Sequence, residues 1–384
     1  MNAQDHTSES AGRCMPTAGG YHAFFPNVLP PRLEIDWALA RLLSEADQAL
    51  AELSGAGQLL PNPHLLIRPY LRREAVLSSQ IENTIAGMDE LFYLEAGQDN
   101  TRNPDLHEVA NHVRALEEGL ARMSSLPIST RLLCELHGIL LSEVRGGATS
   151  KTPGELRRSQ NWIGRPGATV ANATYVPPPP EEMQQALGEW ENYLHAESAE
   201  PVLVKCALLH YQFEAIHPFL DGNGRIGRLI ITLYLCASGK LSLPLLYLSG
   251  FFEEHRDEYY RRLLAVSQQG DWRGWLDYFL LGVRTQAQLA LADTRQVLAF
   301  YEQWRKRLRD DARAPKAALG IVDEVFANPV FSIARHCENS GTPFKTVSRS
   351  VAWLMKAGLL REVTGQKRHR LFVADELMKL MSTR

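Results

Sequence analysis

The sequence has little cysteine, no long apolar run and no large excess of charge of one sign. Its five cysteines are odd in number, widely spread and without a Cys-x-x-Cys pair, which argues against a zinc site or a disulfide framework. The longest apolar run, 229–237, is far shorter than the roughly 20 residues that span a bilayer. The net charge of −3 indicates no general affinity for polyanions. These absences predict a soluble globular protein with reduced thiols.

The N-terminal residues 1–20 are polar and lack the apolar centre of a signal peptide. Their Ser, Thr, Gly and acidic content is typical of a disordered segment. We therefore expect a disordered N-terminus and a cytoplasmic location, with no association with a membrane.

Apolar residues recur at helical spacing through most of the chain. This pattern predicts helices over 34–54, 69–82, 106–123, 129–144, 180–195, 226–236, 270–284 and 287–309. Residues 154–180 differ, since two short extended segments surround a loop rich in Gly and Pro. Read from the residues alone, they predict an ordinary surface β-hairpin.

A glycine-containing turn followed by an apolar run lies near the middle of the chain. Gly222 and Gly224 allow the backbone to turn sharply and approach a ligand, and 226–236 follows as a helix. The start of a helix offers free N–H groups and a positive dipole end, which together attract an anion. Arg225 and Arg228, three residues apart, share one helical face and suit phosphate oxygens.

The same stretch carries residues suited to chemistry on a phosphate. His217 precedes the turn, where an imidazole could take a proton from a hydroxyl. Asp221 offers one hard oxygen ligand, which suits a magnesium ion shared with substrate phosphates. Asn223 adds an amide donor. Each residue alone is more often structural, but their joint spacing predicts attack on a nucleotide phosphate.

The stretch resembles the signature of the Fic family, His-x-Phe-x-(Asp/Glu)-Gly-Asn-Gly-Arg-x-x-Arg. The resemblance implies transfer of AMP from ATP to a Ser, Thr or Tyr hydroxyl of a protein. It implies that His217 is the general base, that Asp221 holds Mg²⁺ and that Phe219 is a core anchor. His255 stands about where many similar proteins carry Asn near the nucleotide. The implied ATP-binding residues are Gly222, Asn223, Gly224, Arg225, Ile226, Gly227, Arg228 and His255.

A second motif lies far upstream of the first. Ser78 and Glu82, four residues apart, share a helical face and are followed by Asn83. They match the (Ser/Thr)-x-x-x-Glu-(Gly/Asn) inhibitory motif that accompanies many Fic domains. The resemblance implies that Glu82 pairs with Arg228 and hinders productive ATP binding. The alternative is an exposed glutamate near a helix end.

The C-terminal residues 315–384 differ in character from the rest of the chain. Three predicted helices are followed by a hairpin with a basic tip, which resembles a winged helix-turn-helix. The third helix carries Lys345, Thr346 and Arg349 on its N-terminal half, where recognition residues usually lie. Residues 315–384 contain eleven basic and six acidic residues. DNA contact is one interpretation, and a dimerisation or protein-docking module is the other.

The sequence therefore predicts a mainly α protein, with a Fic-type helical bundle, a small β-hairpin flap and a C-terminal winged helix-turn-helix. The predicted function is an ATP- and Mg²⁺-dependent protein adenylyltransferase restrained by Glu82, acting on a protein target with the chain itself among the candidates. A DNA-binding regulator that senses a nucleotide and an enzyme that also removes AMP are the alternatives. Monomer and homodimer both stay open. The predicted regions are a disordered 1–20, an N-terminal helical region 21–125, a catalytic domain 126–285, a linker helix 286–314 and the winged helix 315–384.

Overall fold

The structure is a computed structural model that describes residues 1–58, 64–98, 103–144, 151–366 and 369–382. Helices dominate it, so the predicted mainly α fold is confirmed. Up to the long helix, the elements are η1 (Ala3–Asp5), β1 (Gly12–Pro16), β2 (His22–Pro26), α1 (Trp37–Gln58), α2 (His64–Ile81), α3 (Met88–Glu95), α4 (Pro104–Arg122), α5 (Thr130–Leu140), α6 (Pro180–His195), α7 (Val202–Ile216), α8 (Asn223–Ala237), α9 (Ser249–Glu254) and α10 (Arg256–Gln269). The remainder are α11 (Trp272–Asp310), α12 (Ala318–Ala327), β3 (Val330–Ser332), α13 (Ile333–Ser340), α14 (Phe344–Lys356), β4 (Arg361–Glu362), β5 (Leu371–Val373) and α15 (Asp375–Ser382).

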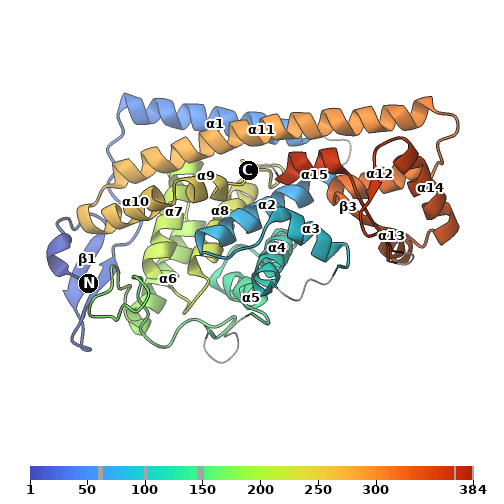
Figure 1. The fold of residues 1–384 in the computed structure, drawn as a ribbon. Coiled ribbons are helices and arrows are strands. Elements are labelled where there is room, and N and C mark those ends of the chain that lie inside the picture. Colours follow the sequence, from blue (N-terminus) through green and yellow to red (C-terminus); the bar gives the residue numbers. More distant parts are fainter. Residues whose placement is uncertain (59–63, 99–102, 145–150, 367–368, 383–384) are drawn as a thin grey trace.

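Two consecutive helices, α7 and α8, form the centre of the molecule (Figure 1). α7 is apolar on nearly every side and is buried almost along its whole length, as expected for a helix without a polar face. α8 packs against α7, and α2, α4 and α5 contact α8. The loop between α7 and α8 therefore starts and ends on rigid, buried elements.

The longest helix, α11, runs along one side of the molecule with α1 packed beside it (Figure 1). Its 39 residues span about 58 Å at 1.5 Å per residue. The predicted break between a helix over 270–284 and a separate helix over 287–309 is wrong, because α11 runs through it. Thr285 and Gln286 interrupt the apolar pattern, but Gln286 and Ala287 are buried and no Gly or Pro occurs from Val283 to Asp310.

The N-terminal segment is ordered, so the predicted disorder of residues 1–20 is wrong. β1 pairs antiparallel with β2, with Cys14 opposite Phe24. Phe24 is fully buried, and the Thr7 N–H donates to the Gln268 carbonyl oxygen at 2.7 Å. The polar composition hid this order because the partners of the segment lie outside it, in residues 22–26 and at the end of α10.

The predicted flap contains less β-structure than a regular hairpin. Its two extended segments meet in one antiparallel bridge, between Ile163 and Tyr175. The Ile163 N–H donates to the Tyr175 oxygen at 2.8 Å, and the Tyr175 N–H returns a bond of 3.0 Å. Pro166 and the proline run 177–180 restrict the ladder, because proline has no N–H to donate.

The C-terminal module, which we define as residues 315–382, packs against α2 and α3. Its three strands form an antiparallel sheet in the order β3-β5-β4, with α12, α13 and α14 beside it. Arg72 of α2 donates to the Ala327 oxygen at 3.2 Å, and the Asn328 amide donates to the Phe92 oxygen at 3.2 Å. Lys367 and Arg368, in the predicted basic tip, lie outside the described residues.

Across the described part of the chain, no helix is both long and apolar enough to cross a membrane.

Candidate active site

The loop between α7 and α8 carries the central motif and is held rigidly by its own residues. His217 ends α7 in a left-handed conformation (φ 51°), and Gly222, at φ 78°, precedes α8 in the same region. The buried Asn223 side chain closes the loop, because its oxygen accepts the Phe219 N–H and its amide donates to the Phe219 oxygen, both at 2.8 Å. The Asn223 amide, which we expected to donate to a ligand, therefore bonds to the loop itself.

The imidazole of His217 is neutral at physiological pH. Burial lowers its pKa to about 4, and the positive charge of Arg157 acts in the same direction. Nδ1 lies 3.3 Å from the Glu214 carbonyl oxygen. Because a carbonyl oxygen only accepts hydrogen bonds, Nδ1 carries the proton and Nε2 remains available as a base.

Two buried side chains that were not predicted as site residues hold this loop through hydrogen bonds to its backbone. The fully buried Arg157 donates through Nε to the His217 oxygen at 2.9 Å and through its guanidinium to the Pro178 oxygen. Burial lowers the pKa of Arg157 to about 10. Asn161 donates to the Phe219 oxygen at 2.8 Å. No local pattern marks either residue, since their partners are backbone groups 21 to 60 positions away.

His137 is a third positioning residue that sequence reasoning missed. Its ring stacks on Phe219 with centroids 3.9 Å apart. Nδ1 accepts the Gly154 N–H at 2.9 Å, so Nε2 carries the proton and donates to the Asp221 oxygen at 3.0 Å. Burial lowers its pKa to about 4. His137 therefore supports the loop as a neutral ring.

Asp221 lies at the start of α8 as an ionised carboxylate. Burial alone would raise its pKa, but the hydrogen bond from Lys151 and the charge of Arg225 bring that pKa below its usual value. The Gly222 N–H donates to Oδ1 at 2.6 Å. In the described residues, no group of three or more His, Cys, Asp or Glu side chains could hold a metal ion.

Arg228 is almost fully buried and contacts both residues of the upstream motif. Its Nε donates to Ser78 Oγ at 2.8 Å, and one terminal nitrogen donates to the Ser78 carbonyl at 2.9 Å and to Glu82 Oε1 at 2.8 Å. Burial opposes the charge of Arg228, but the Glu82 carboxylate raises the arginine's pKa above its ordinary value. Glu82 and Arg228, 146 positions apart, thus join the two motifs in one charge-assisted contact.

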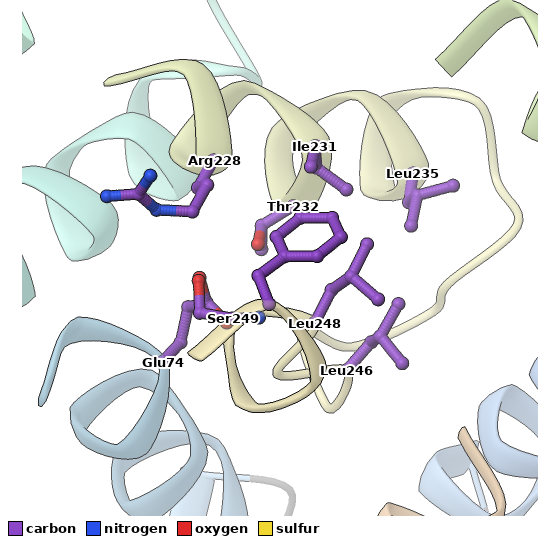
Figure 2. Close-up of a pocket in the computed structure, with 9 residues that line it drawn as sticks. Glu74, Arg228, Ile231, Thr232, Leu235, Leu246, Leu248 and Ser249 are labelled. Atoms are coloured by element: carbon purple, nitrogen blue, oxygen red, sulfur yellow. The ribbon is translucent and has the colours of Figure 1, made fainter. Parts of the chain in front are cut away.

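A further carboxylate lies on the other side of this arginine. Figure 2 shows Glu74 of α2 and Ser249 of α9 facing the Arg228 side chain from α8. The Ser249 N–H and hydroxyl both donate to Glu74. Burial raises the pKa of Glu74 to about 7. Glu74, Ser78 and Glu82, spaced by four, place one face of α2 against Arg228.

The turn at the start of α8 has no room for a side chain at Gly224. A methyl group there would overlap Glu82 Oε1 and crowd the Arg228 guanidinium. The absence of a side chain is thus required for the close approach of the Glu82 carboxylate to the backbone of α8.

A cleft of about 670 Å³ opens beside these groups. Its wall includes four of the predicted site residues, namely Glu82, His217, Gly224 and Arg228. Glu214 also lines it, and burial raises the pKa of this carboxyl to about 7. The remaining wall comes from the flap, α7 and α10 and includes Trp162, Ile163, Tyr175, Arg256, Tyr259 and Tyr260. The cleft therefore joins a base, an arginine and an aromatic wall.

Other predicted site residues do not line this cleft. Arg225 is buried and paired with Glu108 at 3.0 Å, and Ile226 and Gly227 are enclosed in α8. His255 is exposed at the break between α9 and α10, where its Nδ1 lies 3.1 Å from the Phe251 oxygen of its own helix. Arg256 lines the cleft instead and donates to Asn83 Oδ1 at 2.8 Å. Asn83 therefore anchors the end of α2.

Together, the fold and the site define a helical protein with an anion-binding helix start beside a neutral base. The sequence matches the models Fic/DOC family N-terminal at residues 40–121 and Fic/DOC family at residues 127–235. The chain belongs to the Fic/DOC family.

Similar proteins include the curated Protein adenylyltransferase Fic of Drosophila virilis, which is 31% identical over 161 residues, covering 41% of this chain and 28% of the relative. Protein adenylyltransferase fic-1 of Caenorhabditis elegans is 31% identical over 155 residues, covering 39% and 26%. The match thus spans less than a third of the length of these relatives. A crystal structure of a Fic family protein from Desulfovibrio desulfuricans superposes with a TM-score of 0.61 at 21% identity, covering 90% of this chain and 98% of the other. This likeness shows the fold, and the predicted Fic-type helical bundle is confirmed.

Proposed function

We propose that this protein transfers AMP from ATP to a Ser, Thr or Tyr hydroxyl of a protein and is restrained by Glu82. The observation that carries the proposal is the cleft in which neutral His217, the α8 start and Arg228 meet, with Glu82 on Arg228. The names of the curated relatives support the same chemistry.

In the proposed reaction, the acceptor hydroxyl oxygen forms a bond to the α-phosphorus of ATP. The bond between that phosphorus and the oxygen bridging to the β-phosphate breaks, and pyrophosphate leaves. His217 Nε2 takes the hydroxyl proton, which suits a base that is already neutral. The α8 N–H groups and Arg228 stabilise the phosphate charge.

Asp221 would hold a magnesium ion together with phosphate oxygens of ATP. The ionised carboxylate at the start of α8 fits such an ion, since magnesium in nucleotide sites commonly takes one or two carboxylates and substrate phosphates. When bound, the ion supplies positive charge that neutralises the polyphosphate. Gly222, Asn223 and Arg225 would shape this turn for the nucleotide, Asn223 through its bonds to Phe219 and Arg225 through its pair with Glu108.

Glu82 would restrain the enzyme by occupying Arg228 and placing negative charge where the outer phosphates must lie. The Glu82 side chain is 35% exposed, whereas Arg228 is 1% exposed. The carboxylate is thus the partner that is free to move away. Its departure would leave Arg228 available for phosphate.

The test is incubation of wild type, Glu82→Gly and His217→Ala with ATP labelled on the α-phosphate, followed by mass analysis of the protein. We expect Glu82→Gly to incorporate at least about tenfold more AMP than wild type, since a charge-assisted hydrogen bond is worth roughly 1.5–3 kcal/mol. His217→Ala should incorporate none. Glu254→Gly, at an exposed glutamate of α9, is the matched control and should behave as wild type. Equal labelling of Glu82→Gly and wild type would contradict the restraint.

Removal of AMP is a second candidate activity, because the Glu82 carboxylate lines the same cleft as His217. Glu82 would orient a water molecule for attack on the phosphodiester. The modified protein, freed of ATP, would then lose its AMP in the presence of wild type but not of Glu82→Gly. Retention of the label in both incubations would exclude this activity.

The C-terminal module supports a further proposal, that of a winged helix-turn-helix that contacts DNA. The element order α12-β3-α13-α14-β4-β5 and the sheet order β3-β5-β4 agree with that assignment. Lys345, Thr346 and Arg349 are exposed on α14. A regulator that senses a nucleotide through the Fic fold would combine this module with the cleft. Whether the chain forms a homodimer can be decided by measuring its particle mass in solution.

A further inference from the structure

Lys151 forms an ion pair with the proposed metal ligand. Its Nζ lies 2.7 Å from Asp221 Oδ2, and the two side chains are 24% and 39% exposed. Lys151 lies 70 positions before Asp221, outside both motifs. It reaches the start of α8 from the segment that precedes the loop-supporting Arg157.

The contact satisfies the last free oxygen of the carboxylate. Oδ1 accepts the Gly222 N–H at 2.6 Å and lies 3.8 Å from Arg225. Oδ2 is held by Lys151. An ammonium is a compact, strongly hydrated point charge, and so it resembles a small metal ion more closely than a guanidinium does.

We propose that Lys151 is a built-in competitor for the divalent cation: its ammonium occupies the cation position on Asp221 and must leave Oδ2 before a metal ion binds there. The inference rests on the proposed function, which assigns Asp221 as the metal ligand. One consequence is that the metal alone binds weakly. The nucleotide must bring additional negative charge, so metal and nucleotide bind cooperatively.

The test measures Mn²⁺ affinity of the full chain without nucleotide, from the loss of the electron paramagnetic resonance signal of free Mn²⁺. Lys151→Met should bind Mn²⁺ about five- to tenfold more tightly than wild type, because a partly exposed ion pair is lost and a repulsive charge is removed. Lys240→Met is the matched control. Lys240 pairs with Asp47 at 2.8 Å with similar exposure, but it follows the opposite end of α8. The Mn²⁺ affinity of Lys240→Met should therefore equal that of wild type.

The double variant Asp221→Asn with Lys151→Met tests whether the gain in Mn²⁺ affinity arises at Asp221. The double variant should lose the tight binding if the competition takes place at Asp221. If Lys151→Met alone binds Mn²⁺ as wild type does, or more weakly, the competitor proposal is overturned while the adenylyltransferase proposal stands. If Asp221→Asn leaves the Mn²⁺ affinity of Lys151→Met unchanged, the assignment of Asp221 as a metal ligand fails as well. Lys151→Gln keeps a hydrogen-bond donor without the charge and should show the same gain, which covers the case in which methionine impairs folding.

Discussion

At the residue scale, the chemistry of the site depends on side chains that the interior keeps in one charge state. His217 is neutral because it is shielded from water and faces the positive charge of Arg157. His137 is neutral for the same reason of burial. Asp221, by contrast, is ionised because Lys151 and Arg225 outweigh its burial. A base and an anion thus coexist within one short loop.

The lowered pKa of His217 predicts a base that works under acidic conditions. A depressed pKa means that the proton is bound only at lower pH, so the basic form persists above pH 4 and is lost below it. We expect the His217 ring signal, followed by nuclear magnetic resonance in the ligand-free protein, to titrate near pH 4 rather than near pH 6.5. Comparison with His217→Ala assigns the signal. A midpoint near 6.5 would show that the ring is accessible to water.

Replacement of Arg157 tests whether that residue holds the loop. Arg157→Met leaves the His217 and Pro178 oxygens without their buried donor. We expect the free energy of unfolding in urea to fall by about 3 kcal/mol. The adjacent Arg158 is an apt control, since its side chain is 86% exposed and pairs with nearby Glu155. Arg158→Met should cost less than about 1 kcal/mol, and similar losses in the two variants would refute the role of Arg157.

At the scale of elements, packing extends or joins helices beyond what local composition suggests. The predicted helix over 180–195 coincides with α6, because Pro180 at its first position and the following acidic residues mark the start clearly. α11 joins two predicted helices, since Gln286 is buried against Gly250 of α9 and the following Ala287 is buried as well. A polar pair therefore did not end a helix whose buried face continues on both sides.

A proline on the exposed side of α11 tests its continuity. Gln288 is exposed, so Gln288→Pro removes a backbone hydrogen bond without disturbing the core directly. We expect a loss of about 3 kcal/mol or more in the free energy of unfolding, measured in urea. Gln288→Ala should be nearly neutral. If Gln288→Pro and Gln288→Ala have the same free energy of unfolding, the helix is interrupted near residue 286.

At the scale of the whole molecule, α2 connects distant parts of the chain. Its C-terminal half carries Ser78 and leads to Glu82, which contact Arg228, while Arg72 near its N-terminal half contacts α3 and the C-terminal module. The N-terminal strands and the end of α10 enclose the other end of the molecule. The helix that leads to the Glu82–Arg228 contact in the cleft is therefore the same helix that contacts the C-terminal module (Figure 1).

Contact between the C-terminal module and DNA would appear as salt-sensitive binding by the full chain. We expect labelled duplex DNA to bind at low salt and to dissociate as salt increases, because phosphate contacts release counterions. Lys345→Ala with Arg349→Ala should weaken this binding. Arg41→Ala, at an arginine that is 78% exposed on α1, should not. The absence of binding by wild type at low salt would end the DNA proposal and favour a docking module.

Much of the site could be predicted because its central motif is contiguous. A histidine, a glycine turn and a helix start that are adjacent in sequence stay adjacent in space, so His217, Gly224 and Arg228 were found from residues alone. His255, assigned by analogy with a family position, lies at the break between α9 and α10, outside the cleft. Lys151, Arg157 and His137 carry no local signature, and only long-range contacts reveal them.

The sequence by itself determined the helical class and the turn before α8, and it predicted His217 as the base, because these depend on spacing within a few residues. The tertiary structure decided which groups remain free for a ligand. It used the Asn223 amide inside the loop, paired Arg225 with Glu108 and brought Glu82 onto Arg228. Such pairing depends on how α2, α4 and α8 pack. Burial then requires each polar group to find a partner, wherever that partner lies in the sequence.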